Sequence, residues 1–364
     1  AAKGEIGMVH TVPDGMSPGS DTANLSVLGY NPRKYYSGRS PLEALSIGVP
    51  MKDTDIALRC NLVTLSEEED RYEDRTMIDH SSSEISTEDA AVLLEAVRKE
   101  LETDEFQFYV GTSYRHLLIW DKGEVVSLAQ PHDILEQKIT DKLPENKALY
   151  EMMKKSYDIL KDHPVNLDRI KRGLNPANSI WIWGEGRKPR LESFKKLYGL
   201  DGAVISAVDL IKGIAICAGL KSIDVEGATG NISTNFKGKA DAALDALKDG
   251  ADFVYIHLEA PDECGHRAEI ENKVRSIELI DEKIVGYIKE KLNKIGEEYR
   301  MLILPDHPTP LSLRTHTRDA VPFVLYDSTD EKNSEISSYT EENAKKSGIY
   351  FDKGYKLLCE FLKK

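Results

Sequence analysis

After residue 200, short apolar runs of strand length alternate with segments that have a helical pattern of apolar and polar residues. This arrangement predicts strands separated by helices. A run with Val and aromatic residues at 252–258 has the length of a buried strand, and residues 221–225 predict another. The segment from Ser206 to Ala218 predicts a helix that ends at Gly219, and the Ala-rich residues 239–248 predict a second. This rhythm is typical of a mostly parallel sheet flanked by helices, so we expect an α/β fold.

From residue 274 the apolar side chains recur every three or four positions, which places them on one face of a helix. The face consists of Ile277, Ile280, Ile284, Ile288 and Leu292, and we expect it to pack onto a sheet. Residues 299–304 predict the next strand, and the prolines that follow end it. Near the start of the chain, residues 5–9 also predict a strand.

Residues 52–180 show a different pattern, in which the strand-like segments 56–65, 106–110 and 117–120 are separated by charged helical stretches. We interpret them as an inserted, smaller α+β domain that binds substrate. Residues 1–51 and 181–364 would then form one core, because the site described below needs motifs from both parts. At 364 residues the chain exceeds the usual size of a single hydrophobic core, about 250–300 residues.

Composition narrows the class of protein. The chain has 40% hydrophobic and 30% charged residues, which indicates a folded globular protein, and its apolar runs are too short to cross a bilayer. The four cysteines are scattered without a CxxC spacing, which favours a reducing cytoplasm over a disulfide framework. The net charge of -14 argues against a nucleic-acid partner, and the short apolar runs argue against a membrane partner, so an anionic ligand needs local cations. The pattern does not predict an oligomeric state.

Two predicted strands are each followed by metal-ligand residues. Asp262 and His266 come after the strand at 252–258, Asp306 and His307 come after the strand at 299–304, and His316 lies in the next polar loop. In open α/β sheets, ligands bind beyond the carboxyl ends of strands. A lone His at such an end is more often a hydrogen-bonded loop residue, but two carboxylates and three imidazoles together favour two metal sites.

A serine precedes the first predicted helix. Pro18-Gly19 favours a turn and residues 24–28 have helical character, so Ser20 lies at the start of a helix, where phosphate binds well. Taken alone, Ser20 would simply cap that helix. Beside two metal ions its hydroxyl becomes a nucleophile, because a metal lowers the pKa of a coordinated hydroxyl. The G-x-S-x-G motif of serine hydrolases does not occur in the sequence.

Several long segments resemble one family in order along the chain. They are PGSDTANLSVLGYNPRKYYSGRSPLEA, GAVISAVDLIKGIA, GATGN, FVYIHLEAPDECGH and LPDHPTP followed by THTRDAVPF. The chain resembles the archaeal-type, cofactor-independent phosphoglycerate mutases over nearly its whole length. These are two-metal phosphotransferases of the alkaline phosphatase superfamily, so the resemblance implies an alkaline-phosphatase-like core with an inserted domain.

The resemblance also implies roles for individual residues. Ser20 would accept the phosphoryl group, one metal ion would be held by Asp262, His266 and His316, and the other by Asp306, His307 and Ser20. The ions would be Mn²⁺ or Zn²⁺, with Mg²⁺ and Co²⁺ as alternatives, and 2,3-bisphosphoglycerate would not be needed. Members of the family begin with a strand ending in Asp-Gly, which we expect upstream of Glu5 among about 35 to 40 further residues.

Cations on the inserted domain and around it are candidates for binding the small phosphorylated substrate, because Arg binds carboxylate and phosphate in a bidentate manner. Arg115 is preferred because it lies beside a His in an otherwise apolar strand. For each residue the alternative is an ordinary surface interaction. The candidates are Arg39, Arg59, His80, Arg115, His116, Arg187 and Lys237.

Together, these observations and the resemblance predict an enzyme that interconverts 3-phosphoglycerate and 2-phosphoglycerate through a phosphoserine intermediate. Three alternatives remain open at the level of sequence: a homoserine-kinase-like phosphotransferase, a metal-dependent phosphomonoesterase, and a binding module without catalysis. A Walker A loop, which would indicate nucleotide binding, does not occur.

Overall fold

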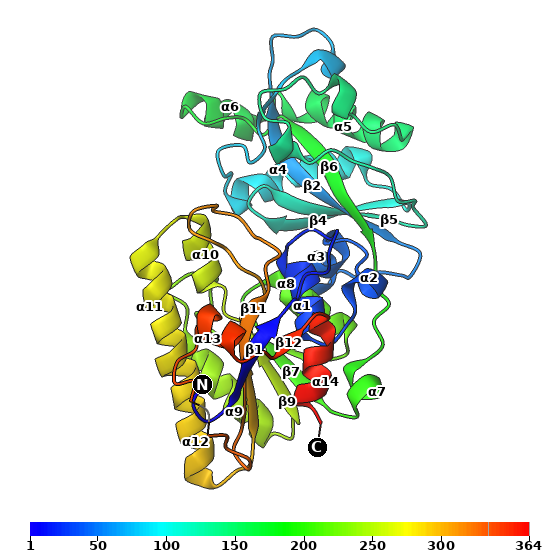
Figure 1. Cartoon of the computed structure of the whole chain (residues 1–364). Coiled ribbons are helices and arrows are strands. Elements are labelled where there is room, and N and C mark those ends of the chain that lie inside the picture. Colours follow the sequence, from blue (N-terminus) through cyan, green and yellow to red (C-terminus); the bar gives the residue numbers. More distant parts are fainter. Residues whose placement is uncertain (334, 364) are drawn as a thin grey trace. The chain divides into compact units, whose positions relative to one another are not determined.

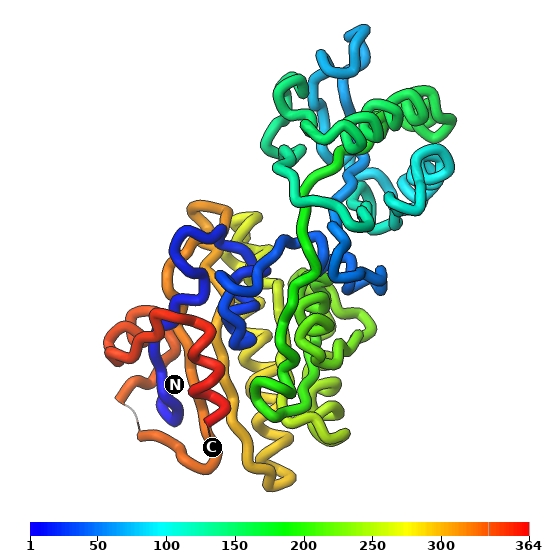
Figure 2. Tube along the Cα trace, turned by 90° about the vertical axis from the view of Figure 1, so that its right-hand side faces the viewer, coloured from blue at the N-terminus to red at the C-terminus, as the bar shows by residue number. Residues whose placement is uncertain are grey.

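The chain divides into two compact units in a computed structural model that describes residues 1–333 and 335–363. Unit 1 comprises Ala1–Tyr36 and Arg190–Lys364, and unit 2 comprises Ser37–Pro189. In Figures 1 and 2, unit 2 is the part of the chain that runs from lighter blue through cyan to green. Among the described residues, none of the helices is both long and apolar enough to span a membrane.

Unit 1 contains two sheets. The first is parallel throughout and has the order β8 (Lys221–Ile223), β7 (Gly202–Ile205), β9 (Phe253–Ile256). The second has the order β10 (Arg300–Ile303), β11 (Val321–Asp327), β1 (Glu5–Val9), β12 (Tyr350–Phe351). The prediction of a strand at residues 5–9 is therefore confirmed.

The expectation of a mostly parallel sheet holds for the first sheet and is wrong for much of the second. Strand β11 runs antiparallel to both of its neighbours, with Ile303 opposite Val324 and Val9 opposite Val321. A parallel connection needs a crossover, usually a helix, and the segment between β10 and β11 is a loop without one. The chain therefore returns in the opposite direction, and only β1 and β12 pair in parallel.

Helices surround these sheets (Figure 1). The predicted helix at 206–218 begins later, at Asp209, because the Ser206 hydroxyl instead accepts a hydrogen bond from the amide of Val208. The helices of unit 1 are α1 (Ser20–Val27), α2 (Pro32–Tyr35), α7 (Phe194–Tyr198), α8 (Asp209–Cys217), α9 (Phe236–Lys248), α10 (Ala260–His266), α11 (Ile270–Ile280), α12 (Tyr287–Ile295), α13 (Glu341–Lys346) and α14 (Leu357–Phe361).

The long amphipathic helix predicted from residue 274 is interrupted by a π-helical turn at Asp281–Gly286, which joins α11 to α12. Within and after the turn the predicted apolar face is buried, at Ile284, Ile288 and Leu292. Before the turn, Ile277 is 54% exposed. The extra residue per turn of a π helix shifts the apolar stripe, so the two halves bury different amounts of it.

Unit 2 is built on an antiparallel sheet with the order β3 (Met77–Asp79), β2 (Ile56–Leu65), β5 (Arg115–Trp120), β4 (Phe106–Thr112), and β6 (Ser179–Arg187) also pairs with β2. Its main core lies between this sheet and two long helices. The helices of the unit are α3 (Ser40–Ser46), α4 (Thr87–Leu101), α5 (Lys147–Leu160) and α6 (Pro164–Lys171). Helix α3 belongs here because Ala44 packs with Ala57 and Leu117 in a second buried cluster.

A candidate metal site beside a helix-start serine

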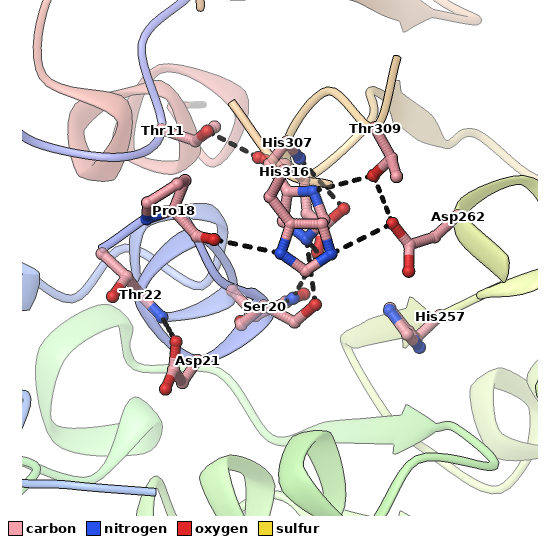
Figure 3. A network of polar contacts seen from close by, with 12 residues as sticks. Thr11, Pro18, Ser20, Asp21, Thr22, His257, Asp262, His307, Thr309 and His316 are labelled. Atoms are coloured by element: carbon pink, nitrogen blue, oxygen red, sulfur yellow. Dashed lines mark hydrogen bonds and ion pairs between the residues drawn. The ribbon is translucent and has the colours of Figure 1, made fainter. Parts of the chain in front are cut away.

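Three segments of unit 1 bring the predicted site residues together, and Figure 3 shows Ser20, Asp262, His307 and His316 among them. Helix α10 follows β9 closely and carries Asp262 and His266 one turn apart, so both project from one face. The loop after β10 supplies Asp306 and His307, and the same loop continues to His316. Ser20, the first residue of α1, completes the group.

Asp262, His266 and His316 form a group whose ligand atoms all lie within 4.8 Å of one another. The Nε2 atoms of the two histidines are 2.9 Å apart. The carboxylate of Asp262 is 3.2 Å from His266 Nε2 and 3.3 Å from His316 Nε2. One carboxylate and two imidazoles are a ligand set that suits zinc or manganese.

Hydrogen bonds to carbonyl groups orient the two imidazoles. The Nδ1 atom of His266 lies 3.0 Å from the carbonyl oxygen of Arg314, and the Nδ1 atom of His316 lies 3.0 Å from that of Pro18. A carbonyl can only accept, so each Nδ1 carries a proton and each Nε2 points into the group. Two neutral imidazoles would bring their Nε2 lone pairs within 2.9 Å of each other, which is unfavourable unless a proton or a metal ion lies between them, so the arrangement can accommodate a metal ion.

The charges in the group agree with this assignment. Burial raises the pKa of the Asp262 carboxyl, but hydrogen bonds from His316 and Thr309 outweigh burial and leave the pKa below its ordinary value. Burial likewise opposes protonation of His316, but Asp262 outweighs it and raises the pKa of His316. Asp262 is therefore an ionised ligand, and His316 attracts a proton when it has no other cation as partner.

Ser20 belongs to a second group of side chains. Its hydroxyl oxygen lies 3.0 Å from His307 Nε2, which is in turn 3.4 Å from the carboxylate of Asp306. The rings of His307 and His316 lie 3.9 Å apart between centroids, so the two groups are contiguous. Ser20 does not act as a helix cap, because the N-cap is Gly19 and no side chain caps α1.

Three residues that the sequence did not single out support these groups. Asn24, one turn after Ser20, donates from its amide to the carbonyl of Ser20 and to the carboxylate of Asp306, both at 2.8 Å. The hydroxyl of Thr309 donates to Asp262, and that of Thr11 donates to the carbonyl of Asp306 at 2.5 Å. The i,i+4 spacing of Asn24 from Ser20 is a signal that could have identified it, whereas Thr309 has none.

A buried histidine and a buried lysine lie close to this site. His257 is 8% exposed, and burial lowers its pKa to about 4; its Nδ1 lies 3.2 Å from the hydroxyl of Ser206. Lys239 is 1% exposed, and its ammonium group donates to the carbonyl of His257 at 3.2 Å. Burial lowers the pKa of Lys239 to about 8. Figure 3 shows His257 next to Asp262.

Two of the candidate substrate cations, Arg59 and Arg39, share one carboxylate partner, Glu43. Arg59 donates from Nε to Glu43 at 2.9 Å, with a second contact through its other nitrogen, and its guanidinium stacks 4.7 Å from the ring of Trp183. Arg39 donates to the same carboxylate at 2.8 Å. Burial opposes ionisation of Glu43, but the two arginines lower its pKa below the ordinary value.

The two neighbouring candidates on β5 point to opposite sides of the sheet. Arg115 is exposed and lies beside the ring of Tyr114, whereas His116 is only 1% exposed. Successive strand residues point to opposite faces. Both faces of β5 are buried from His116 onward, so Arg115 is exposed as the first residue of the strand. The ring of His116 accepts a hydrogen bond from the amide of Gly111, and burial lowers its pKa to about 4. His116 is therefore an interior residue of unit 2.

The remaining candidates have ordinary surroundings. His80 is half-buried with its ring 5.8 Å from that of Tyr114. Arg187 is exposed and donates to the carbonyl of Gly123 at 3.3 Å. Lys237 forms an exposed ion pair at 2.5 Å with the acidic residue one helical turn later, Asp241.

The mixed α/β fold, with a carboxylate–imidazole group that could hold a metal ion, is typical of the class of metal-dependent α/β enzymes. The family profile of 2,3-bisphosphoglycerate-independent phosphoglycerate mutase matches residues 1–166. The chain is 48% identical over 362 residues to a probable mutase of this name from Geobacter sulfurreducens, covering 98% of the chain and 90% of that protein. It is also 48% identical to the Methanosarcina barkeri mutase, covering 96% and 87%.

Two solved structures are similar in fold. The PH0037 protein of Pyrococcus horikoshii superimposes with a TM-score of 0.80 at 27% identity, over 99% of this chain and 87% of that one. The cofactor-independent phosphoglycerate mutase of Thermoplasma acidophilum gives 0.65 at 23% identity, over 100% and 90%. The chain belongs to the family of 2,3-bisphosphoglycerate-independent phosphoglycerate mutases, which are isomerases.

Proposed function

We propose that the chain interconverts 3-phosphoglycerate and 2-phosphoglycerate, with Ser20 as the residue that carries the phosphoryl group between the two hydroxyls. The observation that supports this most directly is the hydroxyl of Ser20, 3.0 Å from His307 Nε2 and free of any capping role. It lies next to a carboxylate–imidazole group suited to a divalent cation. Membership of the mutase family supports the substrate.

The residues fit two divalent cations, with Asp262, His266 and His316 holding one and Asp306, His307 and Ser20 the other. Bound ions would neutralise the phosphoryl oxygens and lower the pKa of the serine hydroxyl. The ligand types favour Mn²⁺ or Zn²⁺.

The chemistry at Ser20 is a pair of displacements. In the first, the Ser20 hydroxyl loses its proton as Oγ forms a bond to phosphorus, the bond from phosphorus to the 3-oxygen of glycerate breaks, and that oxygen takes a proton. In the second, the 2-hydroxyl of glycerate loses its proton and attacks the phosphoserine, so the Ser20 oxygen leaves and takes a proton back. The N-terminus of α1 adds a favourable dipole for the phosphate at Ser20.

Retention of glycerate between the two displacements separates a mutase from a phosphatase. We assign this task to unit 2, as the inserted domain on an alkaline-phosphatase-like core formed by unit 1. Exposed Arg115, and Arg39, Arg59, His80, Arg187 and Lys237, remain candidates for binding its carboxylate or phosphate. Exclusion of water during the exchange would prevent hydrolysis of the phosphoserine.

The test is Ser20→Ala, with Ser17→Ala as the matched control because Ser17 is an exposed serine in the loop directly before α1. With manganese present and 3-phosphoglycerate added, intact-mass spectrometry of the quenched wild type and control is expected to detect a phosphoryl adduct on Ser20. The Ser20→Ala variant is expected to show neither the adduct nor 2-phosphoglycerate. Full turnover by that variant would exclude Ser20 as the nucleophile.

The same assay separates the alternatives. Free phosphate released from both phosphoglycerates, without their interconversion, would indicate a phosphomonoesterase. Phosphorylation of homoserine from a nucleotide donor, without mutase activity, would indicate the kinase-like function. A metal-loaded protein that binds phosphoglycerates but turns over neither would indicate a binding module.

A further inference from the structure

The three imidazoles of the site differ in what their Nδ1 atoms contact. Those of His266 and His316 face backbone carbonyl oxygens, as described above. The Nδ1 atom of His307 instead lies 3.4 Å from the side-chain hydroxyl of Thr309. A carbonyl oxygen can only accept a hydrogen bond, whereas a hydroxyl can either donate or accept. Thr309 therefore fixes the tautomer of His307 only if another group takes the hydroxyl proton.

The carboxylate of Asp262 takes that proton. The hydroxyl of Thr309 donates to Asp262, and Figure 3 shows Thr309 with contacts to both groups. A hydroxyl has one proton, so the same oxygen offers only a lone pair to His307. An unprotonated Nδ1 would face this lone pair, which is unfavourable for a ring that is only 4% exposed. The Nδ1 atom of His307 is therefore expected to carry the proton.

The other ring nitrogen of His307 faces Ser20. With the proton on Nδ1, the Nε2 atom keeps its lone pair, 3.0 Å from the hydroxyl of Ser20 and 3.4 Å from the carboxylate of Asp306. This is the tautomer that can bind a metal ion through Nε2. With the proton on Nε2, the ring would donate a hydrogen bond at this point and could not serve as a ligand there.

The position of Thr309 is itself fixed by its neighbours. The residue is 5% exposed, and Pro310 after it favours an extended backbone. The ammonium group of Lys273, on α11, donates to the carbonyl oxygen of Thr309 at 2.8 Å. A Cβ on Gly265, in α10, would come within 2.6 Å of the same oxygen, so the absence of a side chain there allows the close approach.

We propose that Thr309 is a positioning residue that links the two candidate metal groups. By donating to Asp262 and accepting from His307, its hydroxyl orients one ligand and selects the metal-binding tautomer of another. The two groups are thereby coupled, because the carboxylate in the first takes the proton that would otherwise allow Thr309 to donate to the imidazole in the second. This inference rests on the proposed function, since it concerns the orientation of the proposed ligands.

Two substitutions separate the hydroxyl of Thr309 from its packing. Thr309→Val keeps the branched shape and removes the hydroxyl, whereas Thr309→Ser keeps the hydroxyl and removes the methyl group. Thr317→Val is the matched control, because Thr317 lies in the same loop and its hydroxyl donates to Asp319 at 2.7 Å. A role of the hydroxyl predicts that only Thr309→Val changes the site.

The tautomer of His307 can be measured in the protein without metal. Nitrogen NMR of histidine-labelled protein at about pH 8.5, where an ordinary imidazole is neutral, distinguishes a protonated ring nitrogen from an unprotonated one. His307→Gln assigns the signals. The wild type, Thr309→Ser and Thr317→Val are expected to carry the proton on Nδ1, and Thr309→Val a mixture of both tautomers. Any other state in the wild type, or an unchanged state in Thr309→Val, would overturn the proposal.

Titration calorimetry with Mn²⁺ gives a second readout. Thr309→Val is expected to bind the ion about tenfold to a hundredfold more weakly than the wild type, because the partners of metal ligands contribute effects of this size. Thr309→Ser and Thr317→Val are expected to match the wild type. Wild-type affinity in Thr309→Val would contradict the proposal, and so would equal losses in Thr309→Val and Thr309→Ser, which would assign the effect to packing.

A variant outside the loop serves if Thr309→Val does not fold. Lys273→Met removes the donor to the Thr309 carbonyl and is expected to shift the tautomer and the Mn²⁺ affinity in the same directions. Unchanged values of both would count against the proposal.

The outcomes also separate this inference from the proposed function. A wild type that binds Mn²⁺ and interconverts the phosphoglycerates, with an unaffected Thr309→Val, would overturn only the role of Thr309. A wild type with the expected tautomer that neither binds Mn²⁺ nor interconverts the phosphoglycerates would overturn the proposed function and support the hydrogen-bond arrangement around Thr309.

Discussion

The two histidines that face Asp262 each use one ring nitrogen for a carbonyl and present the other to the same point. Replacing His266 with Ala removes one of three ligands, so the affinity for Mn²⁺ or Zn²⁺ is expected to fall by about a hundredfold or more. Metal content after dialysis, measured by plasma mass spectrometry, and titration calorimetry would test this. His163→Asn is the control, because His163 caps α6 and Asn preserves a cap. Unchanged metal content in His266→Ala would exclude this group as a metal site.

Lys239 gives a pH-dependent prediction. Its pKa is about 8 in the folded chain against an ordinary value of 10.5, because burial outweighs the favourable charge of Glu259. Between these pH values the unfolded chain binds more protons, so stability rises with pH through this window. Lys239→Met is expected to stabilise the chain by about 1–2 kcal/mol below pH 8, allowing for partial screening, and to lose this gain near pH 10.5.

Urea unfolding of Lys239→Met and wild type at several pH values would measure this difference. A gain that stays constant across the window would mean that deprotonation of Lys239 is not involved, and that the substitution acts only through packing.

At the level of single residues, the sequence could indicate ligand types but not their contacts. Asp262, His266 and His316 were expected to lie close together because they follow strand ends, and their ligand atoms do lie within 4.8 Å; their role as ligands stays a prediction. The contact of Thr309 with Asp262 joins residues 47 apart and depends on how a loop folds back. Alternation along β5 could have placed Arg115 and His116 on opposite faces, but it could not show which of them is exposed, because both faces of the strand are buried after Arg115.

At the level of elements, β1 is held closely between its neighbours at one glycine. A Cβ on Gly7 would come within 2.7 Å of the ring of Phe323 on β11 and 2.8 Å of the carbonyl oxygen of Ile349. Gly7→Ala is expected to lower the free energy of unfolding by about 1–3 kcal/mol, because overpacking forces neighbours apart. Urea denaturation would test this, with Glu5→Ala in the same strand expected to cost less than about 0.5 kcal/mol. Equal stability of the two variants would contradict the tight contact.

Elements with a clear period could be predicted, and elements whose form depends on distant partners could not. The apolar runs at residues 5–9 and 56–65 predict strands, and both strands have these bounds in the structure. The direction of β11 depends on the loop before it, which carries no periodic signal. The sequence also gives no signal for the π turn between α11 and α12, because the spacing of Ile277, Ile280 and Ile284 is that of an unbroken helix.

At the level of the whole molecule, the net charge of -14 opposes an anionic substrate at long range, so binding of phosphoglycerate must depend on local groups. The sequence shows the net charge directly. It does not show which carboxylates the cations pair with, because Arg59 and Arg39 converge on Glu43 only when β2 and α3 are in place. Which cations can bind an anionic substrate therefore depends on how each unit folds.

Unit 2 should fold by itself, because it is one continuous segment, Ser37–Pro189, with its own hydrophobic core. All buried residues of that core lie between Ile56 and Trp183, and the second cluster, which includes Ala44 and Ile119, is also internal to the unit. Expressed alone, the segment is expected to unfold in one cooperative urea transition, with an m-value appropriate to about 150 residues. Circular dichroism and tryptophan fluorescence would follow it, since Trp120, Trp181 and Trp183 are all buried here. A non-cooperative transition would show that the core of unit 2 needs unit 1 to form.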